Sequence, residues 1–205
     1  KFFDLLVENK VNFFKSKNLE KDTVSLSDAI SDLLQSHGTK ESPDTKNFRA
    51  GIYAKATTSY QKLMRKDKNL TKKVASSHRF ANHKKETIEK FQYILEFGRA
   101  NKNISDEIKA KYNIKKRTVV PLCSNSPTPT LTTLPDDYIH YCEPRILTVR
   151  EYARIQSFPD SYEFKGGYTT GGDRRKSDVP RYTQIGNAIP PLFAEQAGLV
   201  LKDMI

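Results

Sequence analysis

The side chains best suited to nucleophilic or metal chemistry are few and do not form a recognisable set. Cys123 and Cys142 are the only two thiols, and their spacing is typical of neither a zinc site nor a disulfide framework. His78 and His83 are five residues apart, which does not place them on one face of a helix. The sequence therefore predicts no metal centre.

Basic residues are concentrated in the first part of the chain. Residues 1–120 contain 26 Lys and Arg against 14 Asp and Glu, whereas residues 121–205 contain 9 against 10. Such an excess can be a solvated face, but it also suits a surface that follows nucleic-acid phosphates. The composition is globular, with no apolar run near the roughly 20 residues of a membrane span, so we expect no membrane partner and a cytoplasmic, nucleoid-associated protein.

Two strings near the C-terminal end carry the most specific pattern. The first, residues 145–160, reads RILTVREYARIQSFPD, and the second, residues 184–191, reads QIGNAIPP. Thr148 and Glu151 have the spacing of a capping box, which predicts a helix from Thr148 that stops near Phe158, before Pro159.

The second string predicts a turn followed by a helix. Gly186 and Asn187 suit a tight, permissive turn, and Pro190 and Pro191 suit the first turn of a helix that runs to about Asp203. Taken singly, both strings could belong to ordinary packing helices.

Together and in this order, the strings resemble the last two signature blocks of the DNA (cytosine-5) methyltransferases. Enzymes of this family flip a cytosine out of duplex DNA, attack C6 with the cysteine of a Pro-Cys dipeptide and transfer methyl from S-adenosylmethionine to C5. The sequence contains no Pro-Cys, no Phe-x-Gly-x-Gly cofactor loop and no Glu-Asn-Val string. We therefore expect no catalytic residue in this chain, which should be inactive alone and need a missing catalytic domain or subunit.

The resemblance assigns roles to residues that are present. Asn187, Ala188 and Ile189 match the block that closes over S-adenosylmethionine, although Asn187 could merely cap its own turn. Thr130 and Leu131 resemble a Thr-Leu dipeptide whose threonine contacts the DNA backbone. Arg145, Arg150 and Glu151 match the block that braces the recognition region, and we expect both arginines to contact DNA phosphates as a second role.

The resemblance also implies an organisation. We expect residues 1–39 to be a connector from the missing catalytic domain, residues 40–142 to be the target recognition region, and residues 143–205 to complete a Rossmann-like methyltransferase domain located elsewhere. The expected fold is α+β, mostly helical with short strands. We expect an exposed apolar surface where the catalytic domain would pack, through which the isolated chain could form a non-native dimer.

Local patterns supply the remaining elements. Apolar periodicity and caps predict helices over residues 1–17, 28–34, 53–65, 84–98 and 104–116, strands over 118–122 and 136–141, and a loop over 37–47. The helix over 104–116 could belong to a helix-turn-helix, or be a local recognition or packing helix. Residues 166–176 read as a flexible basic loop.

Two kinds of function remain open. The chain is either part of a DNA cytosine-5 methyltransferase, as a piece of one polypeptide or as the subunit of a split enzyme, or a stand-alone DNA-binding module without catalysis. The intact QIGN string favours the first, because a protein that only binds DNA has no use for a cofactor turn. The target sequence and the base-reading residues cannot be named from the pattern.

Overall fold

The computed structural model describes residues 1–19, 23–66, 73–169 and 178–205. Its α-helices are α1 (Phe2–Ser16), α2 (Leu26–Ile30), α3 (Ser59–Met64), α4 (Lys85–Phe97), α5 (Asp106–Lys111), α6 (Val149–Ile155), α7 (Arg181–Gly186) and α8 (Pro191–Asp203). Its strands are β1 (Thr39–Glu41), β2 (Arg49–Ile52), β3 (Val74–Arg79), β4 (Val120–Pro121) and β5 (Tyr138–Ile139). The described part of the chain is therefore α+β with short strands, as the sequence predicts. Most of the expected basic loop lies outside the described residues.

Strands β1, β2 and β3 form an antiparallel sheet in that order. Lys40 pairs with Ala50, and Ala50 pairs with Arg79 on the other side. The prediction of a loop over 37–47 is wrong at Thr39–Glu41, and the patterns had not indicated β2 or β3. Their short runs alternate poorly, so pairing with one another decides their conformation.

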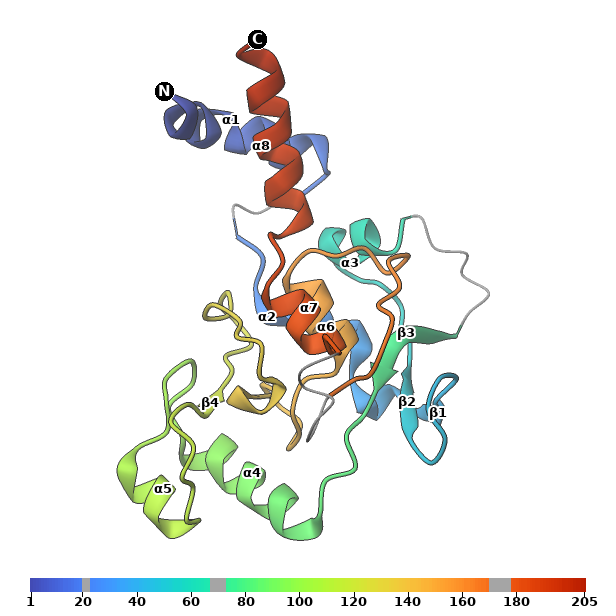
Figure 1. Cartoon of the computed structure of the whole chain (residues 1–205), viewed down its shortest axis with the longest axis vertical. Coiled ribbons are helices and arrows are strands. Elements are labelled where there is room, and N and C mark those ends of the chain that lie inside the picture. Colours follow the sequence, from blue (N-terminus) through green and yellow to red (C-terminus); the bar gives the residue numbers. More distant parts are fainter. Residues whose placement is uncertain (20–22, 67–72, 170–177) are drawn as a thin grey trace.

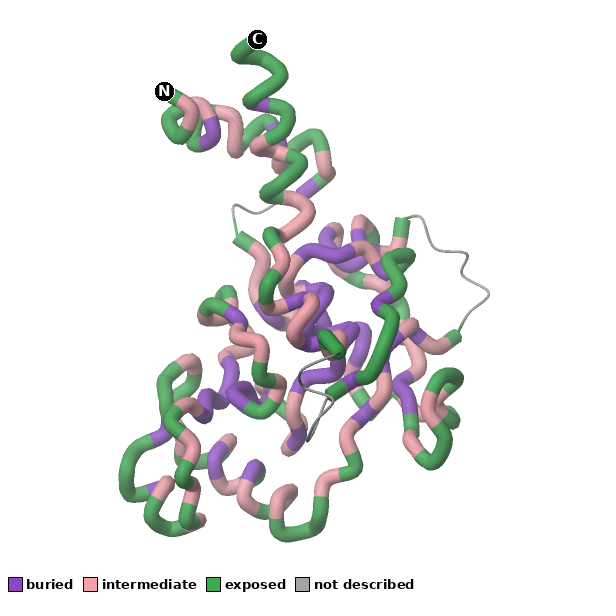
Figure 2. The backbone as a smooth tube through the Cα atoms, viewed as in Figure 1, coloured by how far each residue is buried: buried purple, intermediate pink, exposed green. Residues whose placement is uncertain are grey.

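Helix α6 lies at the centre of the molecule, between the sheet and α2, α3 and α7 (Figures 1 and 2). It is almost wholly buried, and Leu147, Val149, Tyr152 and Ala153 are fully enclosed. Tyr60 of α3 donates its hydroxyl to the carbonyl of Arg154 at 2.6 Å. Tyr182 of α7 donates to the carbonyl of Leu147 at 2.7 Å. The element that carries the first string is thus the one around which the main core packs.

Helices α1 and α8 pack against each other at one end of the molecule, apart from the sheet (Figure 1). Gln196 of α8 donates to the carbonyl of Leu6 at 2.8 Å, and Lys17 forms an ion pair with Glu195. The backbone N–H of Leu192, in the first turn of α8, donates to the Ser157 hydroxyl at 3.1 Å, which ties α8 to the end of α6. Helix α8 therefore has the bounds that the sequence predicts, and α1 supports it.

Helices α4 and α5 enclose a second, smaller core at the opposite end. Phe91 and Ile94 of α4 pack with Ile108 of α5, and the Ser105 hydroxyl caps α5 as predicted. The connection from Gly98 to Ser105 is much longer than the three to four residues of a helix-turn-helix turn, so that interpretation is wrong. Helix α5 is a packing helix.

Among the described residues, no helix is both long enough and apolar enough to cross a membrane.

Candidate functional site

The capping box at the start of α6 is present as predicted. The Thr148 hydroxyl accepts the backbone N–H of Glu151 at 3.2 Å, and the Glu151 carboxylate accepts the backbone N–H of Thr148 at 2.7 Å. Two N–H groups that a helix start leaves without partners are thereby satisfied. The box fixes Glu151 inside the core, where it has no exposure to solvent.

The Arg145 guanidinium donates hydrogen bonds to two carboxylates. Its terminal nitrogens donate to Glu151 at 2.7 and 2.8 Å, and Nε and Nη2 donate to Glu143 at 2.8 and 2.6 Å. Burial alone would raise the pKa of Glu151, but the Arg145 guanidinium outweighs burial and leaves that pKa lowered to about 2. Arg145 is 5% exposed, so it braces the start of α6 and presents no free donor to a phosphate.

Arg150 is also internal. Its guanidinium donates to the backbone carbonyls of Ser76 at 2.9 Å, Pro159 at 3.2 Å and Tyr162 at 2.7 Å, and the residue has no exposure. These bonds tie α6 to β3 and to the segment after α6. The expectation that Arg145 and Arg150 touch DNA phosphates therefore does not fit this structure, because both side chains are enclosed and paired. Within this chain, both arginines connect α6 to neighbouring segments.

A third arginine of the block, Arg154, joins distant parts of the chain. It bonds to Asp160 at 2.5 and 2.7 Å and to Asp32 at 3.2 and 3.3 Å. Burial raises the pKa of Asp160, but the bonds from Arg154 outweigh it and lower that pKa to about 2. Arg154 thus holds the α2 region against α6, and Asp160, the last residue of the first string, balances its charge.

Two buried histidines complete the surroundings of Glu151. His78 contacts the Thr148 hydroxyl through Nδ1 at 2.8 Å and the Leu33 carbonyl through Nε2 at 2.9 Å. A carbonyl only accepts, so Nε2 carries the proton and Nδ1 accepts from Thr148. Burial lowers the pKa of both His78 and His140 to about 4, so both are neutral at pH 7. No pattern in the sequence indicates this role of the two histidines, because it depends on contacts between residues far apart in the chain.

Thr130 and Leu131 lie in different environments. Thr130 is exposed and its carbonyl accepts the Tyr138 hydroxyl at 2.6 Å. Leu131 is 7% exposed and belongs to the main core, so its side chain does not fit the expected DNA contact. Of this pair, only Thr130 offers a side chain at the surface.

Asn187 follows α7 directly and is exposed, as is Ile189, whereas Ala188 is partly buried against the core. The predicted tight turn is instead the end of a short helix, with Asn187 at φ −89° and ψ −9°. No side-chain hydrogen bond links Asn187 to another described residue, so its amide does not cap its own turn.

The candidate DNA-contact segment at Thr130 and the candidate cofactor segment at Asn187 meet at Gly186. A Cβ on Gly186 would lie 2.6 Å from the Thr132 carbonyl oxygen and 2.9 Å from the Thr133 Cα. The end of α7 therefore touches the segment that carries Thr130, shown in yellow beside α7 in Figure 1. Close approach of two backbones, and not a left-handed turn, is what requires glycine here.

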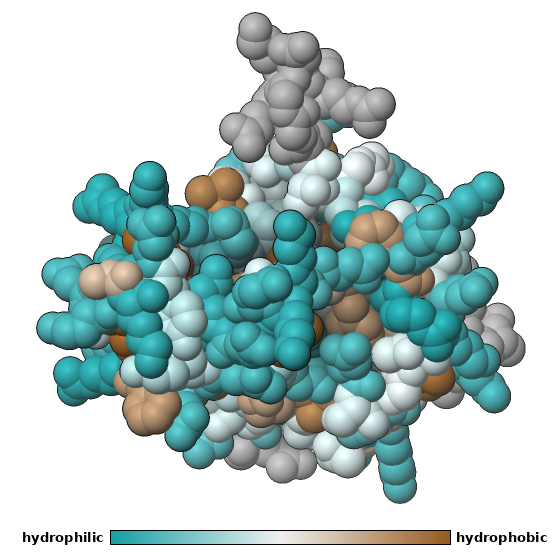
Figure 3. All heavy atoms as spheres, turned by 90° about the horizontal axis from the view of Figure 1, so that it is seen from below, coloured by the Kyte–Doolittle hydropathy of each residue, from teal (hydrophilic) through white to brown (hydrophobic). Residues whose placement is uncertain are grey.

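The surface of the α4–α5 end carries many lysines. Exposed basic residues on and between these elements are Lys84, Lys85, Arg99, Lys102, Lys111, Lys115 and Arg117. Seen from below, the molecule shows a largely hydrophilic face with only scattered hydrophobic groups (Figure 3). Cys123 and Cys142 are free thiols, and the described residues hold no group of three or more potential metal ligands.

Two methyltransferases are similar to this chain. The chain is 33% identical over 131 residues to the type II methyltransferase M.AquIB of Picosynechococcus sp., a match that covers 63% of this chain and 88% of that protein. It is 31% identical over 194 residues to the type II methyltransferase M.DdeI of Desulfomicrobium norvegicum, covering 88% of this chain but only 43% of that protein.

A solved structure shares the fold. It is a crystal structure described as a DNA modification methyltransferase encoded within a prophage (E. coli), with a TM-score of 0.57 and 21% identity. The match covers 88% of this chain and 47% of that one, so the chain spans less than half of this structure. The family model of the C-5 cytosine-specific DNA methylases matches residues 6–203, which is nearly the whole chain. This chain belongs to the C-5 cytosine-specific DNA methylase family, whose relatives are enzymes of DNA modification.

Proposed function

We propose that the chain is the DNA-recognition and C-terminal portion of a DNA cytosine-5 methyltransferase, which transfers methyl from S-adenosylmethionine to C5 of cytosine in duplex DNA. In this proposal residues 1–39 connect to the catalytic domain, residues 40–142 recognise the target, and residues 143–205 complete a Rossmann-like domain. The observation that carries it is the family match over residues 6–203, which includes both strings in order.

The proposal places the cofactor at the end of α7. The side-chain amide of Asn187 is exposed and has no hydrogen-bond partner among the described residues, and such a group suits the charged amino acid end of S-adenosylmethionine. Ile189, 67% exposed, would be covered there once the rest of the enzyme closes over it. Bound S-adenosylmethionine supplies the methyl group, and Thr130 would hold the DNA backbone within reach because its segment touches Gly186.

The nucleophile must come from elsewhere, because Cys123 and Cys142 do not follow proline. We propose that the missing portion packs on the outer surfaces of α1 and α8. Both helices carry exposed apolar side chains, which include Phe3, Val7, Phe193, Leu199 and Leu201. In the isolated chain the same surfaces could support a non-native dimer.

A stand-alone DNA-binding module is the alternative, and one observation weighs against it. M.AquIB, whose length is little more than the 131 residues aligned here, is itself named a methyltransferase. A short chain of this family is therefore not necessarily a remnant without activity. The length of M.AquIB is consistent with a role of the present chain as one subunit of a split enzyme.

Methyl transfer into duplex DNA tests the proposal. Labelled S-adenosylmethionine should label DNA only when the chain is combined with a polypeptide that carries the Pro-Cys and cofactor-loop strings. Asn187→Ala should then raise the cofactor KM, while Asn125→Ala, at another exposed asparagine, should not. Labelling by the chain alone would contradict the proposal, and DNA binding without labelling in any combination would support the binding module.

A further inference from the structure

Arg79, the last residue of β3, is held between aromatic rings. Its guanidinium carbon lies 4.0 Å from the centre of the Phe48 ring and 3.9 Å from that of the Tyr168 ring. Arg181 lies over Tyr168 as well, at 4.3 Å. Contacts of a guanidinium with aromatic faces are favourable and restrict its orientation. The stack therefore presents Arg79 in one fixed position.

No carboxylate in the described part of the chain pairs with Arg79. Its Nε is buried without a hydrogen-bond partner, although the side chain as a whole is partly exposed. Burial lowers the pKa of Arg79, but a guanidinium remains charged at neutral pH. Arg145, Arg150 and Arg154 differ, because internal acceptors surround each of them.

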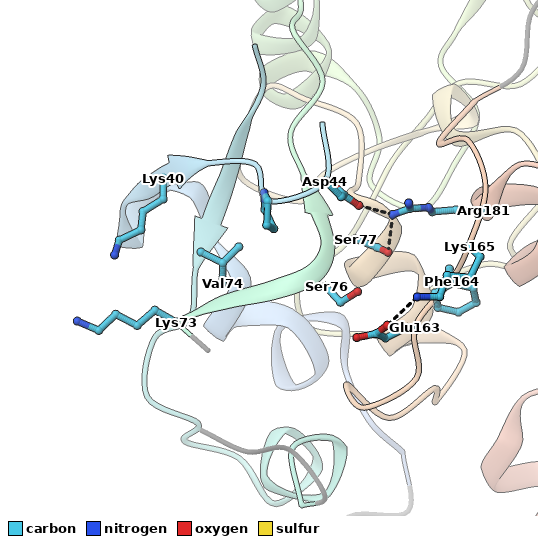
Figure 4. Close-up of a pocket in the computed structure, with 11 residues that line it drawn as sticks. Lys40, Asp44, Lys73, Val74, Ser76, Ser77, Glu163, Phe164, Lys165 and Arg181 are labelled. Atoms are coloured by element: carbon cyan, nitrogen blue, oxygen red, sulfur yellow. Dashed lines mark hydrogen bonds and ion pairs between the residues drawn. The ribbon is translucent and has the colours of Figure 1, made fainter. Parts of the chain in front are cut away.

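Asp44, the described carboxylate that acts on the charge of Arg79, already has partners of its own. It accepts from Arg181 at 2.6 Å (Figure 4), and it also contacts the Tyr168 hydroxyl at 3.1 Å. Arg181 also donates to the Ser77 hydroxyl at 2.9 Å, which fixes its position over Tyr168. Among the described residues, the two stacked arginines thus share one carboxylate, which leaves one positive charge without a paired acid.

The surroundings add positive charge. A cavity of about 630 Å³ beside Arg181 and Asp44 is lined by Lys40, Lys73 and Lys165, of which Lys165 pairs with Glu163 on the same wall at 2.8 Å. Lys40 and Lys73 are therefore the lysines of this lining that add to the charge of the two arginines. Lys46 and Arg49, on the turn and strand that flank Phe48, are exposed. A long-range field of this sign attracts a polyanion.

We propose that Arg79 binds a backbone phosphate of duplex DNA, with Phe48 and Tyr168 holding its guanidinium in place. The inference rests on the proposed function, since it names a DNA contact of the recognition region. Because Nε is enclosed, the terminal nitrogens are the groups left to face two oxygens of a phosphodiester, and charge-assisted pairs of this kind are strong. Contact with a phosphate fixes the position of the protein on DNA and does not read its sequence.

Salt dependence of duplex binding tests the contact, with the full chain in the presence of its catalytic portion. Arg79→Gln should weaken binding by a similar factor for duplexes of different sequence. It should also make the slope of log K against log salt concentration less steep by about 0.9, the value for one lost phosphate contact. Arg79→Lys should keep the slope. Lys62→Gln, an equal loss of charge at an exposed lysine of α3, should change neither slope nor affinity.

The outcomes separate this inference from the proposed function. Duplex binding by the wild type with an unchanged slope in Arg79→Gln would overturn the phosphate contact alone, as would a loss confined to one DNA sequence. A stack that is only structural would lower the urea midpoint of Arg79→Gln and leave the slope unchanged. Inorganic phosphate that stabilises the wild type but not Arg79→Gln, at constant ionic strength, would show a small-anion site instead. Absence of any duplex binding by the wild type would refute the proposed function and this contact together.

Discussion

Glu151→Gln isolates the charge of one buried carboxylate from its role as a helix cap. Gln61 occupies the equivalent position in the capping box of α3, where its side-chain oxygen accepts the N–H of the N-cap Thr58 at 3.5 Å and that of Thr57 at 2.9 Å. Glutamine therefore fits such a box. The substitution should keep the hydrogen bond to Thr148 and remove the negative charge that faces Arg145.

The expected loss follows from the shifted pKa of Glu151. A fall in the pKa from the ordinary 4.5 to about 2 corresponds to roughly 3–4 kcal/mol, at about 1.4 kcal/mol per pKa unit. Breaking a buried pair costs a similar ~3–5 kcal/mol, and Glu143 still faces Arg145, which favours the lower end. With a urea m-value of ~2 kcal/mol/M, the midpoint should fall by roughly 1.5 M at pH 7.

Urea unfolding at several pH values provides the assay. Because the folded-state pKa of Glu151 is depressed, its contribution is present above pH 4.5 and is lost as the pH falls towards 2. The difference between the wild type and Glu151→Gln should therefore be constant from pH 6 to 8. Glu89→Gln, the same change in an exposed pair with Lys85 on α4, should cost below ~0.5 kcal/mol. Equal midpoints for the two variants would refute the reasoning.

Other predictions concern glycines and histidines. Gly186→Ala should destabilise the chain by more than about 1 kcal/mol, the order of a strained backbone contact, because its Cβ would meet the Thr132 carbonyl. Gly198→Ala, which has open space around its position in α8, should instead stabilise the chain by up to ~1 kcal/mol. Thermal melts measure both changes. His78 and His140 have depressed pKa values, so their contribution is complete above pH 6.5 and declines as the pH falls towards 4. Urea midpoints should therefore fall between pH 7 and pH 5, and a midpoint independent of pH over this range would contradict the neutral assignment of both rings.

The sequence predicted those helix starts that depend on a few neighbouring residues. The capping box of Thr148 and Glu151, the Ser105 cap of α5, and α8 after Pro190 are all confirmed, because each depends on a few neighbouring residues. The family resemblance came from the same strings and is confirmed by the family match.

Features decided by distant contacts could not be predicted. Strands β1 and β2 exist because they pair across a turn, and β3 joins them from residues farther along the chain. Arg145 and Arg150 looked available for phosphates, since a sequence does not show that Glu143 or the carbonyls of β3 enclose them. For the same reason Arg79 gave no signal, because Phe48 and Tyr168 approach it only after folding.

The pairing of α1 with α8 constrains when the chain can finish folding. Leu6 bonds to Gln196 across a sequence separation of 190 residues, and Leu6 and Phe13 are buried in the finished structure. During synthesis the apolar side of α1 must therefore wait for α8 to leave the ribosome, while α4 and α5 can pack earlier. Until then α1 is exposed to proteases and chaperones, so a nascent chain arrested before residue 190 should be cleaved within α1 more readily than the released protein.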